Sequence, residues 1–251
     1  MSESQYGKKW TEEETILAFY YYCKIPFGKI HKGNPTIIRI ANLLHRTPSS
    51  VVFKMGNLGH FDPDLQKRNV NGLSNASKTD ATVVKQFYNN WEDLCAQAIK
   101  IEATFSAHED IKNPVGGTVE QMVNGRVNQD FFRESVLASY NYKCCITGLP
   151  IPALLIASHI KPWAVSNPTT ERTNPANGLC LNAFHDRAFD SGLITVKTDY
   201  TICLSSQLQK YCNEDGIGWL SECNGMQIHL PEKFIPEKEF LQYHNDVIFI
   251  P

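Results

Sequence analysis

Residues 154–194 read LLIASHIKPWAVSNPTTERTNPANGLCLNAFHDRAFDSGLI, and this stretch decides the fold of the C-terminal half of the chain. The apolar run at its start predicts a strand that ends on His159. A polar loop rich in proline and asparagine follows this strand. Leu179 and Leu181 then alternate with their neighbours, which predicts a second short strand.

A helix is predicted to follow the second strand. Asn182 is suited to cap it, because an asparagine side chain accepts a hydrogen bond from a free amide of the first helical turn. The helix would carry His185 toward Gly192. A strand, loop, strand and helix in this order are predicted to bring His159, Asn177 and His185 to one site of the size that a metal ion needs.

The order and the neighbours of these residues resemble the HNH endonuclease family, whose catalytic unit is a ββα-metal finger. The resemblance runs from Phe131 to Ile194, with weaker likeness toward the C-terminus. A bare His, Asn, His triplet has little specificity, but the chain carries a longer phrase. That phrase comprises Tyr140, Cys145-Ile146-Thr147-Gly148, Ser158-His159-Ile160, Pro162-Trp163, Arg172, Pro175, Asn177-Gly178-Leu179, Phe189-Asp190 and Gly192-Leu193.

The resemblance implies hydrolysis of DNA with a divalent cation, Mg²⁺ or Mn²⁺, and His159, Asn177 and His185 as the catalytic residues. A neutral histidine can take a proton from water near neutral pH, and His159 receives this role. The cation would bind the scissile phosphate and stabilise the leaving oxyanion. In the family the second His, here His185, commonly belongs to the metal site. The central Asn, here Asn177, either holds the loop or ligates the ion, and the sequence leaves both roles open.

One position departs from the family pattern. Many members place Asp or His immediately before the catalytic His as a metal ligand, whereas this chain has Ser158. Serine is a poor ligand for a hard cation, so the expected protein ligands are Asn177, His185 and Asp186, with water and the DNA phosphate completing the set. Asp190 lies four residues after Asp186 on the same helix face and is expected to be structural. Weak metal binding in the absence of DNA is the predicted consequence.

The N-terminal part of the chain predicts helices, two of which have the spacing of a helix-turn-helix. Thr11 opens a capping box, and Asn34-Pro35 and Thr47-Pro48 each place a cap before a proline of the first helical turn. The last two of these helices are separated by about three residues, so the start of the third would face a DNA groove. The alternative is a small helical domain whose polar face is only solvated. The candidate DNA contacts are Arg46, Ser49, Ser50, Lys54 and Asn57 here, and Lys161 and Arg172 beside the nuclease site.

The sequence therefore predicts an α+β protein with two domains. Residues 1–104 would form the helical target-recognition domain, residues 105–128 a linker, and residues 129–251 the HNH nuclease domain. Within the first domain, residues 62–78 are expected to be a loop, and one long helix is expected from Asp80.

The second domain is predicted to contain further regular elements around the ββα unit. These are a helix over residues 129–140, a hairpin that turns at residues 199–200, a short helix at residues 236–244 and a packed tail at residues 247–250.

Composition limits the classes of protein that remain. An apolar fraction of 42% and a charged fraction of 20% are those of a soluble globular protein. The chain has neither a long apolar run nor a signal peptide, so a membrane partner is not expected and the cytoplasm is the expected location. Residues 1–104 hold 13 Lys and Arg against 10 Asp and Glu, a mild basic excess that fits contact with phosphate.

The 8 cysteines are expected to be reduced thiols that mostly pack in the core. Some relatives of the HNH family carry a structural zinc held by two Cys-x-x-Cys pairs. This chain lacks such pairs, because Cys144 and Cys145 are adjacent, so no structural zinc is expected.

The function that these features predict is a metal-dependent endonuclease acting on double-stranded DNA in restriction or phage defence. A homodimer is expected if both strands are cut at a symmetric site. Within the enzyme class, the alternatives are a nuclease specific for modified DNA and a non-specific toxin nuclease. Outside it, the alternative is a DNA-binding protein whose nuclease site has decayed, for which Ser158 is the hint.

Overall fold

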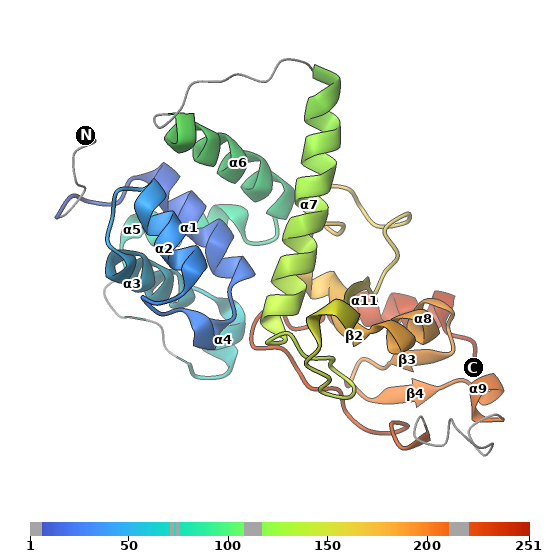
Figure 1. Ribbon diagram of the computed structural model, residues 1–251. Helices are drawn as coiled ribbons and strands as arrows, with labels where there is room; N and C mark the ends of the chain where they lie inside the picture. The colour runs from blue at the N-terminus through green and yellow to red at the C-terminus, as the bar shows by residue number, and fades with distance from the viewer. Residues whose placement is uncertain (1–6, 71–72, 74–75, 108–116, 211–220) are drawn as a thin grey trace. The chain divides into compact units, whose positions relative to one another are not determined.

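The computed structural model describes residues 7–70, 73, 76–107, 117–210 and 221–251 (Figure 1). Helices dominate these residues, and small antiparallel sheets lie in the C-terminal half. The predicted α+β class is confirmed. The chain divides into two compact units, residues 1–131 and residues 132–251. Among the described residues, no helix combines the length and the apolar character that crossing a bilayer requires.

The first unit is helical, as predicted, and its helices begin where the capping residues stand. Thr11 and Glu14 form the predicted capping box at the start of the first helix, with the amide of Thr11 donating to Glu14 at 2.8 Å and the amide of Glu14 donating to Thr11 at 3.2 Å. The elements of this unit are α1 (Glu12–Lys24), η1 (Phe27–Lys29), α2 (Pro35–Leu43), α3 (Pro48–Gly59), α4 (Pro63–Lys67), α5 (Lys78–Phe87), α6 (Trp91–Ala107) and the first part of α7 (Gly117–Ser139).

Helix α1 is the centre of the first unit. It contacts α3, α5 and α6, and most of its side chains are buried. The Tyr22 hydroxyl donates to Asp62 at 2.7 Å in the interior, which satisfies both polar groups. Trp91 and Phe131 stack at 6.0 Å between ring centroids, so α6 and the first part of α7 share this core. Helices α2 and α3 also pack together across their short turn.

Three sequence predictions for the first unit need correction. The single long helix expected from Asp80 is two helices, α5 and α6, because Asn89 adopts a φ of +70° between them. The loop expected at residues 62–78 contains α4. The helix expected from residue 129 is α7, which already begins at Gly117 within the predicted linker of residues 105–128.

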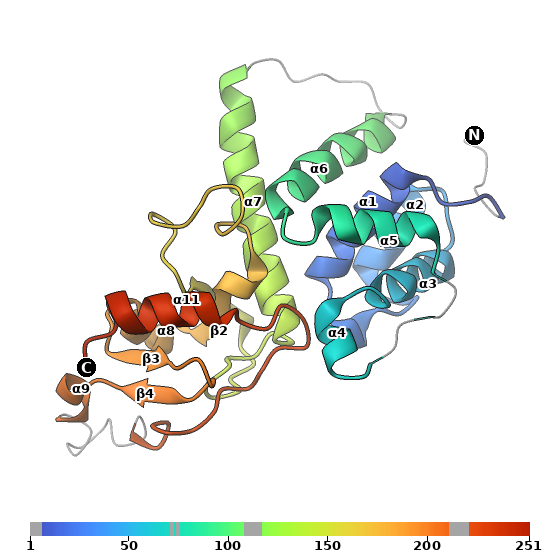
Figure 2. The same cartoon turned by 180° about the vertical axis from the view of Figure 1, so that it is seen from behind.

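The second unit contains the predicted ββα arrangement. Strands β1 (Leu155–His159) and β2 (Gly178–Asn182) pair antiparallel, and α8 (Ala183–Asp190) follows β2 and contacts both strands (Figures 1 and 2). Asn182 caps α8 through a 2.9 Å hydrogen bond from the amide of His185, as predicted. The further elements are η2 (Pro152–Leu154), η3 (Pro175–Asn177), β3 (Ile194–Val196), β4 (Ile202–Leu204), α9 (Ser206–Gln209), α11 (Lys238–Tyr243) and the π-helical η4 (His244–Ile248).

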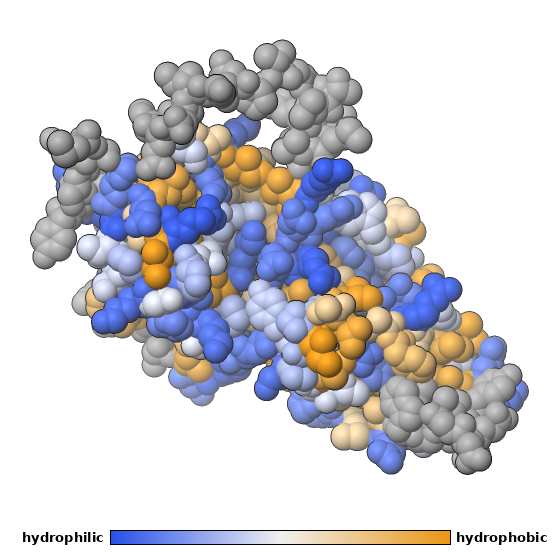
Figure 3. Space-filling model, viewed as in Figure 1, coloured by the Kyte–Doolittle hydropathy of each residue, from blue (hydrophilic) through white to orange (hydrophobic). Residues whose placement is uncertain are grey.

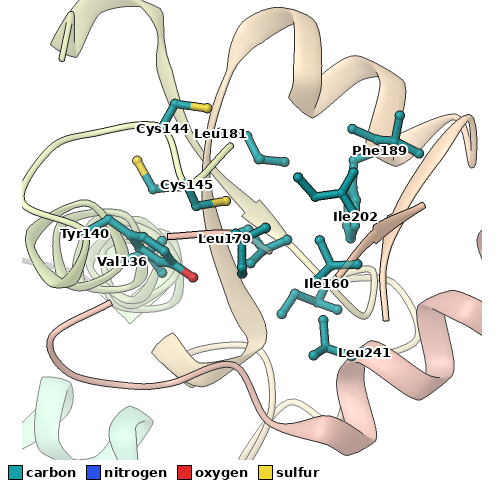
Figure 4. Close-up of a cluster of buried hydrophobic side chains, with 14 of the residues drawn as sticks. Val136, Tyr140, Cys144, Cys145, Ile160, Leu179, Leu181, Phe189, Ile202 and Leu241 are labelled. Atoms are coloured by element: carbon teal, nitrogen blue, oxygen red, sulfur yellow. The ribbon is translucent and has the colours of Figure 1, made fainter. Parts of the chain in front are cut away.

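The core of the second unit lies between α7, the β1–β2 pair and α8. Leu179 and Leu181 of β2 are fully buried, and they point into a cluster with Ile160 and Phe189 (Figure 4). Position 178 requires glycine for a steric reason, because a Cβ atom there would overlap the side chain of Val136 on α7. The approach of β2 to α7 therefore requires glycine directly after Asn177.

The C-terminal elements are mostly where the sequence places them. The hairpin of β3 and β4 turns at the predicted position, and α11 lies within the predicted helical range. The prediction of a packed tail at residues 247–250 is wrong, because Val247 is 58% exposed and Ile250 is 40% exposed. On the face drawn in Figure 3, apolar patches are interspersed with hydrophilic side chains.

Candidate active site

The pairing of β1 with β2 brings His159 and Asn177 together. His159 stands opposite Gly178 in the register, so its neighbour across the strand pair is the residue next to Asn177. The amide of Ile160 also donates to the carbonyl of Asn177 at 2.9 Å. Residues that are 18 positions apart in the sequence, His159 and Asn177, therefore occupy one end of the same short sheet.

The ring of His159 is held from three sides. Its Nε2 lies 2.9 Å from the carbonyl oxygen of Arg172, and since a carbonyl oxygen only accepts, Nε2 carries the proton and donates it. The ring stacks on Phe132 with centroids 3.8 Å apart and planes at 10°. Trp163 meets it edge-on at 5.6 Å. These contacts fix both the tautomer and the orientation of the imidazole.

The same contacts leave Nδ1 of His159 as the basic nitrogen. Within the described part of the chain, Nδ1 has no hydrogen-bond partner and is not fully buried, so water can reach it. Burial lowers the pKa of His159 below its ordinary value of 6.5, and the hydrogen bond to the Arg172 carbonyl opposes part of that shift. The imidazole is therefore neutral at pH 7 and can accept a proton at Nδ1.

Asn177 holds the loop between the two strands. It is fully buried, and its Oδ1 accepts from the amide of Lys161 at 2.8 Å. Its Nδ2 donates to the carbonyl of Lys161 at 3.2 Å, the hydroxyl of Ser166 at 3.4 Å and the carbonyl of Glu171 at 3.3 Å. The carboxamide is thus engaged by both arms of the loop, which favours the loop-holding role over metal ligation. Arg172, whose carbonyl receives the proton of His159, follows directly on the held segment.

His185 lies in the core. It is fully buried, and its Nδ1 is 3.7 Å from the Sγ atom of Cys144. Burial raises the pKa of the Cys144 thiol, but hydrogen bonds with His185 and Thr147 outweigh it and lower that pKa to about 6. This contact engages Nδ1 of the ring, and the predicted metal and catalytic roles of His185 stay predictions. We build the proposed metal set from the carboxylates of α8.

The carboxylates of α8 are the remaining candidates for a metal site. Asp186 is partly buried and lies beside the Ser158 hydroxyl, so it reaches the end of β1 that carries His159. Burial raises the pKa of Asp186 above 3.8, and Ser158 and Arg187 oppose that shift. Burial also raises the pKa of Asp190, and the negative charge of Asp186 raises it further. A cation near both carboxylates would relieve this repulsion.

The donor set restricts which cation fits. In the part of the chain that the structure describes, no group of three His, Cys, Asp or Glu side chains is arranged to hold a metal ion. Mg²⁺ keeps several waters and is commonly bound by one or two carboxylates together with substrate phosphate. Asp186 and Asp190 fit a cation of that kind, and they do not form a closed protein cage.

The two basic residues predicted beside the site differ in their freedom. The ammonium group of Lys161 is 2.6 Å from the carboxylate of Glu171, so its charge is largely neutralised. The guanidinium of Arg172 lies 5.2 Å from the ring centroid of Trp163, and its Nε donates to the Ser166 carbonyl at 3.1 Å. Among the described residues no carboxylate pairs with Arg172. Arg172 is therefore the better placed of the two to meet a phosphate.

Sequence reasoning missed Phe132 and Glu171. Phe132 belongs to α7, and only the tertiary packing shows that its ring stacks on His159. Glu171 pairs with Lys161 and also accepts the amide of Asn167 at 2.7 Å, so it helps to shape the loop. The opposite charges of residues 161 and 171 in one loop are a signal for the pair, although the spacing alone does not specify it.

In the first unit, two of the predicted DNA contacts are engaged inside the protein. Arg46 forms a two-pronged ion pair with Glu14, both bonds at 2.8 Å, and its side chain is 4% exposed. Lys54 pairs with Asp80 at 2.5 Å and is also buried. Both charges are already neutralised, so neither side chain projects as a free phosphate contact. The other three predicted contacts, Ser49, Ser50 and Asn57, line a cavity together with them.

Comparison with known proteins finds a matching family for part of the second unit. No curated protein matches the chain. Residues 144–197 match the model of a family described as HNH endonuclease. The matched range contains β1, the loop, β2, α8 and β3, and so it includes both His159 and Asn177. The resemblance that the sequence predicts is therefore confirmed over residues 144–197, which match the HNH endonuclease family.

Proposed function

We propose that this chain is a divalent-metal-dependent endonuclease that hydrolyses double-stranded DNA, with His159 as the general base. The observation that carries the proposal is the hydrogen bond from Nε2 of His159 to the Arg172 carbonyl, which leaves a neutral imidazole with Nδ1 open to water. The match of residues 144–197 to the HNH endonuclease family supports a DNA substrate.

The residues of the site divide the work of hydrolysis. Nδ1 of His159 takes a proton from a water molecule, the water oxygen attacks phosphorus, and the bond to the 3′-oxygen breaks. Solvent protonates that oxygen, so the products are a 5′-phosphate and a 3′-hydroxyl. Arg172 would hold a phosphate oxygen. Asp186, with Asp190 beside it, would hold the cation, which when bound stabilises negative charge on the phosphate and on the leaving oxygen. Asn177 keeps the loop, and with it the Arg172 carbonyl, in place.

The test of this function is incubation of the full chain with supercoiled plasmid in Mg²⁺ or Mn²⁺, with EDTA as the control. Conversion to nicked and linear forms is expected only with the metal, and end labelling is expected to give 5′-phosphate and 3′-hydroxyl ends. Binding to the plasmid without cleavage in either metal would instead identify a decayed nuclease that only binds DNA. Cleavage of any DNA without regard to sequence would point to a toxin nuclease.

The biological role that we propose is restriction or phage defence in the cytoplasm. Cells that express the chain are expected to reduce phage plating, and cells that express the His159→Ala variant are not. A panel of unmodified, methylated and hydroxymethylated DNA then decides whether the enzyme requires modified bases. Cleavage of both strands at a symmetric site would call for a homodimer, which light scattering of the DNA complex would detect.

Replacing Asp186 by asparagine is expected to raise the Mg²⁺ concentration for half-maximal cleavage by about 10- to 100-fold. The change removes one negative oxygen from the proposed cation site while it keeps the shape of the side chain. Asp199→Asn is the matched control, because Asp199 is fully exposed in the turn between β3 and β4. Cleavage is measured across a Mg²⁺ titration, and an unchanged titration for the Asp186 variant would remove this residue from the metal site.

A further inference from the structure

A second candidate site lies in the first unit, and none of its residues takes part in the proposed hydrolysis. It is a cavity of about 840 Å³ between the segment before α1, the turn that precedes α3, α3 itself and the start of α5. This volume lies within the range of pockets that bind small molecules and cofactors. Arg46 and Lys54 in its wall are paired with Glu14 and Asp80, and Lys9 adds a further positive charge that favours an anionic occupant.

Aromatic rings also line this cavity. Phe53 of α3 is 61% exposed although it is a large apolar side chain. Trp10 lies beside the two buried cations, with the guanidinium carbon of Arg46 at 4.4 Å and the ammonium of Lys54 at 5.0 Å from its ring. Exposed aromatic rings beside positive charge are the surface on which proteins stack nucleobases of unpaired nucleotides. An inorganic anion would be attracted by the positive charge, but it would make no stacking contact with the rings.

One polar atom in the cavity wall lacks a partner. The Oδ1 atom of Asn57 is buried and makes no hydrogen bond in the structure, whereas most buried polar atoms do. This oxygen accepts and would be satisfied by an N–H donor brought in by a ligand. The exocyclic amino groups of adenine and cytosine are donors of that kind.

From these three features we propose that the cavity receives one nucleotide rotated out of the DNA duplex. The base would contact Trp10 and Phe53, its exocyclic amino group would donate to Oδ1 of Asn57, and Lys9 would face the backbone phosphate. A base must leave the stack to enter such a pocket. This proposal rests on the proposed function in taking DNA as the substrate. The sequence predicts that the start of α3 faces a DNA groove. In this proposal the same residues instead line a concave site that holds a single base.

The test measures binding in EDTA, where metal-dependent cleavage does not interfere. Two 30-base-pair duplexes are compared by fluorescence anisotropy, one fully paired and one with a central mismatch that contains 2-aminopurine. Because a mismatched nucleotide is easier to rotate out, the wild-type chain is expected to bind the mismatched duplex about tenfold more tightly. The fluorescence of 2-aminopurine reports unstacking directly, and its emission is expected to change on binding.

Two variants connect this preference to the cavity. Phe53→Ala and Asn57→Leu are expected to bind both duplexes with equal affinity. Ile38→Ala is the matched control, because Ile38 is an exposed apolar residue on the neighbouring helix α2 that does not line the cavity, and this variant should keep the preference. Phe53→Ala decides the question if Asn57→Leu fails to fold, since the Phe53 side chain is already mostly exposed.

The remaining outcomes overturn the proposal in ways that can be told apart. Equal affinity of the wild type for both duplexes would exclude base entry, as would a preference that Phe53→Ala retains. A free nucleotide carries the same base and phosphate as a nucleotide of DNA. Calorimetry with deoxyadenosine and deoxycytidine monophosphates tests whether the cavity binds it. Binding of a free nucleotide as tight as that of the mismatched duplex would make the cavity a nucleotide-sensing site. Plasmid cleavage in Mg²⁺ is read separately, so loss of this proposal leaves the nuclease proposal intact.

Discussion

The His159→Ala variant is expected to cleave DNA about 100- to 10,000-fold more slowly than the wild-type chain, with little change in DNA affinity. The substitution removes the nitrogen that takes the proton from water, whereas the residues proposed to hold phosphate remain. The rate is measured in single turnovers with plasmid in Mg²⁺, and affinity is measured by anisotropy in EDTA. His31→Ala is the matched control, because His31 is exposed in the first unit. Cleavage at the wild-type rate would remove the assignment of the base.

The pH dependence of the wild-type enzyme follows from the same residue. The base must be neutral, and burial lowers the pKa of His159 below 6.5. The cleavage rate is therefore expected to rise with pH through this lowered pKa and to reach its plateau at a lower pH than an ordinary histidine would allow. The linked stability has the matching sign: protonation opposes folding, so stability present above pH 6.5 is lost as the pH falls through the folded-state pKa. A cleavage rate that reaches its plateau only well above pH 6.5 would contradict the assignment of the buried His159 as the base.

The position before the base illustrates how a departure from the family pattern is accommodated. Ser158 is 3% exposed and lies beside Asp186. In this chain the residue before the base therefore lies next to a carboxylate on α8, and that carboxylate is the group that can meet a cation.

Local patterns sufficed for the parts of the fold that local physics decides. The caps at Thr11, Asn34 and Thr47 start helices where expected, because the cap and the helix are a few residues apart. The alternation around Leu179 and the cap at Asn182 likewise give the strand and helix of the nuclease unit. In each case the interacting groups are close neighbours in the sequence, so the pattern contains the cause.

Partners that are distant in the sequence were not predictable in this way. Arg46 reads as a DNA contact because its charge stands at the start of a helix, yet Glu14, which neutralises it, lies 32 residues away. His185 reads as a metal ligand, yet the thiol it meets belongs to Cys144, 41 residues earlier. A single sequence gives the charge or the ligand type of a side chain. Only the assembled fold tells whether that side chain is already engaged.

Asn177→Ala is expected to lower the free energy of unfolding of the nuclease unit by about 3 kcal/mol, because it leaves the buried groups that Asn177 now satisfies without partners. Cleavage is expected to fall about 100-fold, because the loop that presents the Arg172 carbonyl to His159 loses its anchor. Urea unfolding followed by circular dichroism measures the first effect, and single-turnover cleavage the second. Hydrogen exchange at the Lys161 amide, which donates to Asn177, reports the loop itself.

Asn177→Asp separates the two roles that the sequence left open. A carboxylate would be at least as good a ligand for Mg²⁺ as the amide, so metal ligation by residue 177 predicts retained cleavage and a lower Mg²⁺ requirement. Loop holding predicts the opposite, because aspartate loses the Nδ2 donor and faces the carbonyl oxygens of Lys161 and Glu171 with a negative charge. The structure therefore leads us to expect that the aspartate variant is impaired as severely as the alanine variant. An aspartate variant that is active at lower Mg²⁺ than the wild type would transfer Asn177 to the metal site.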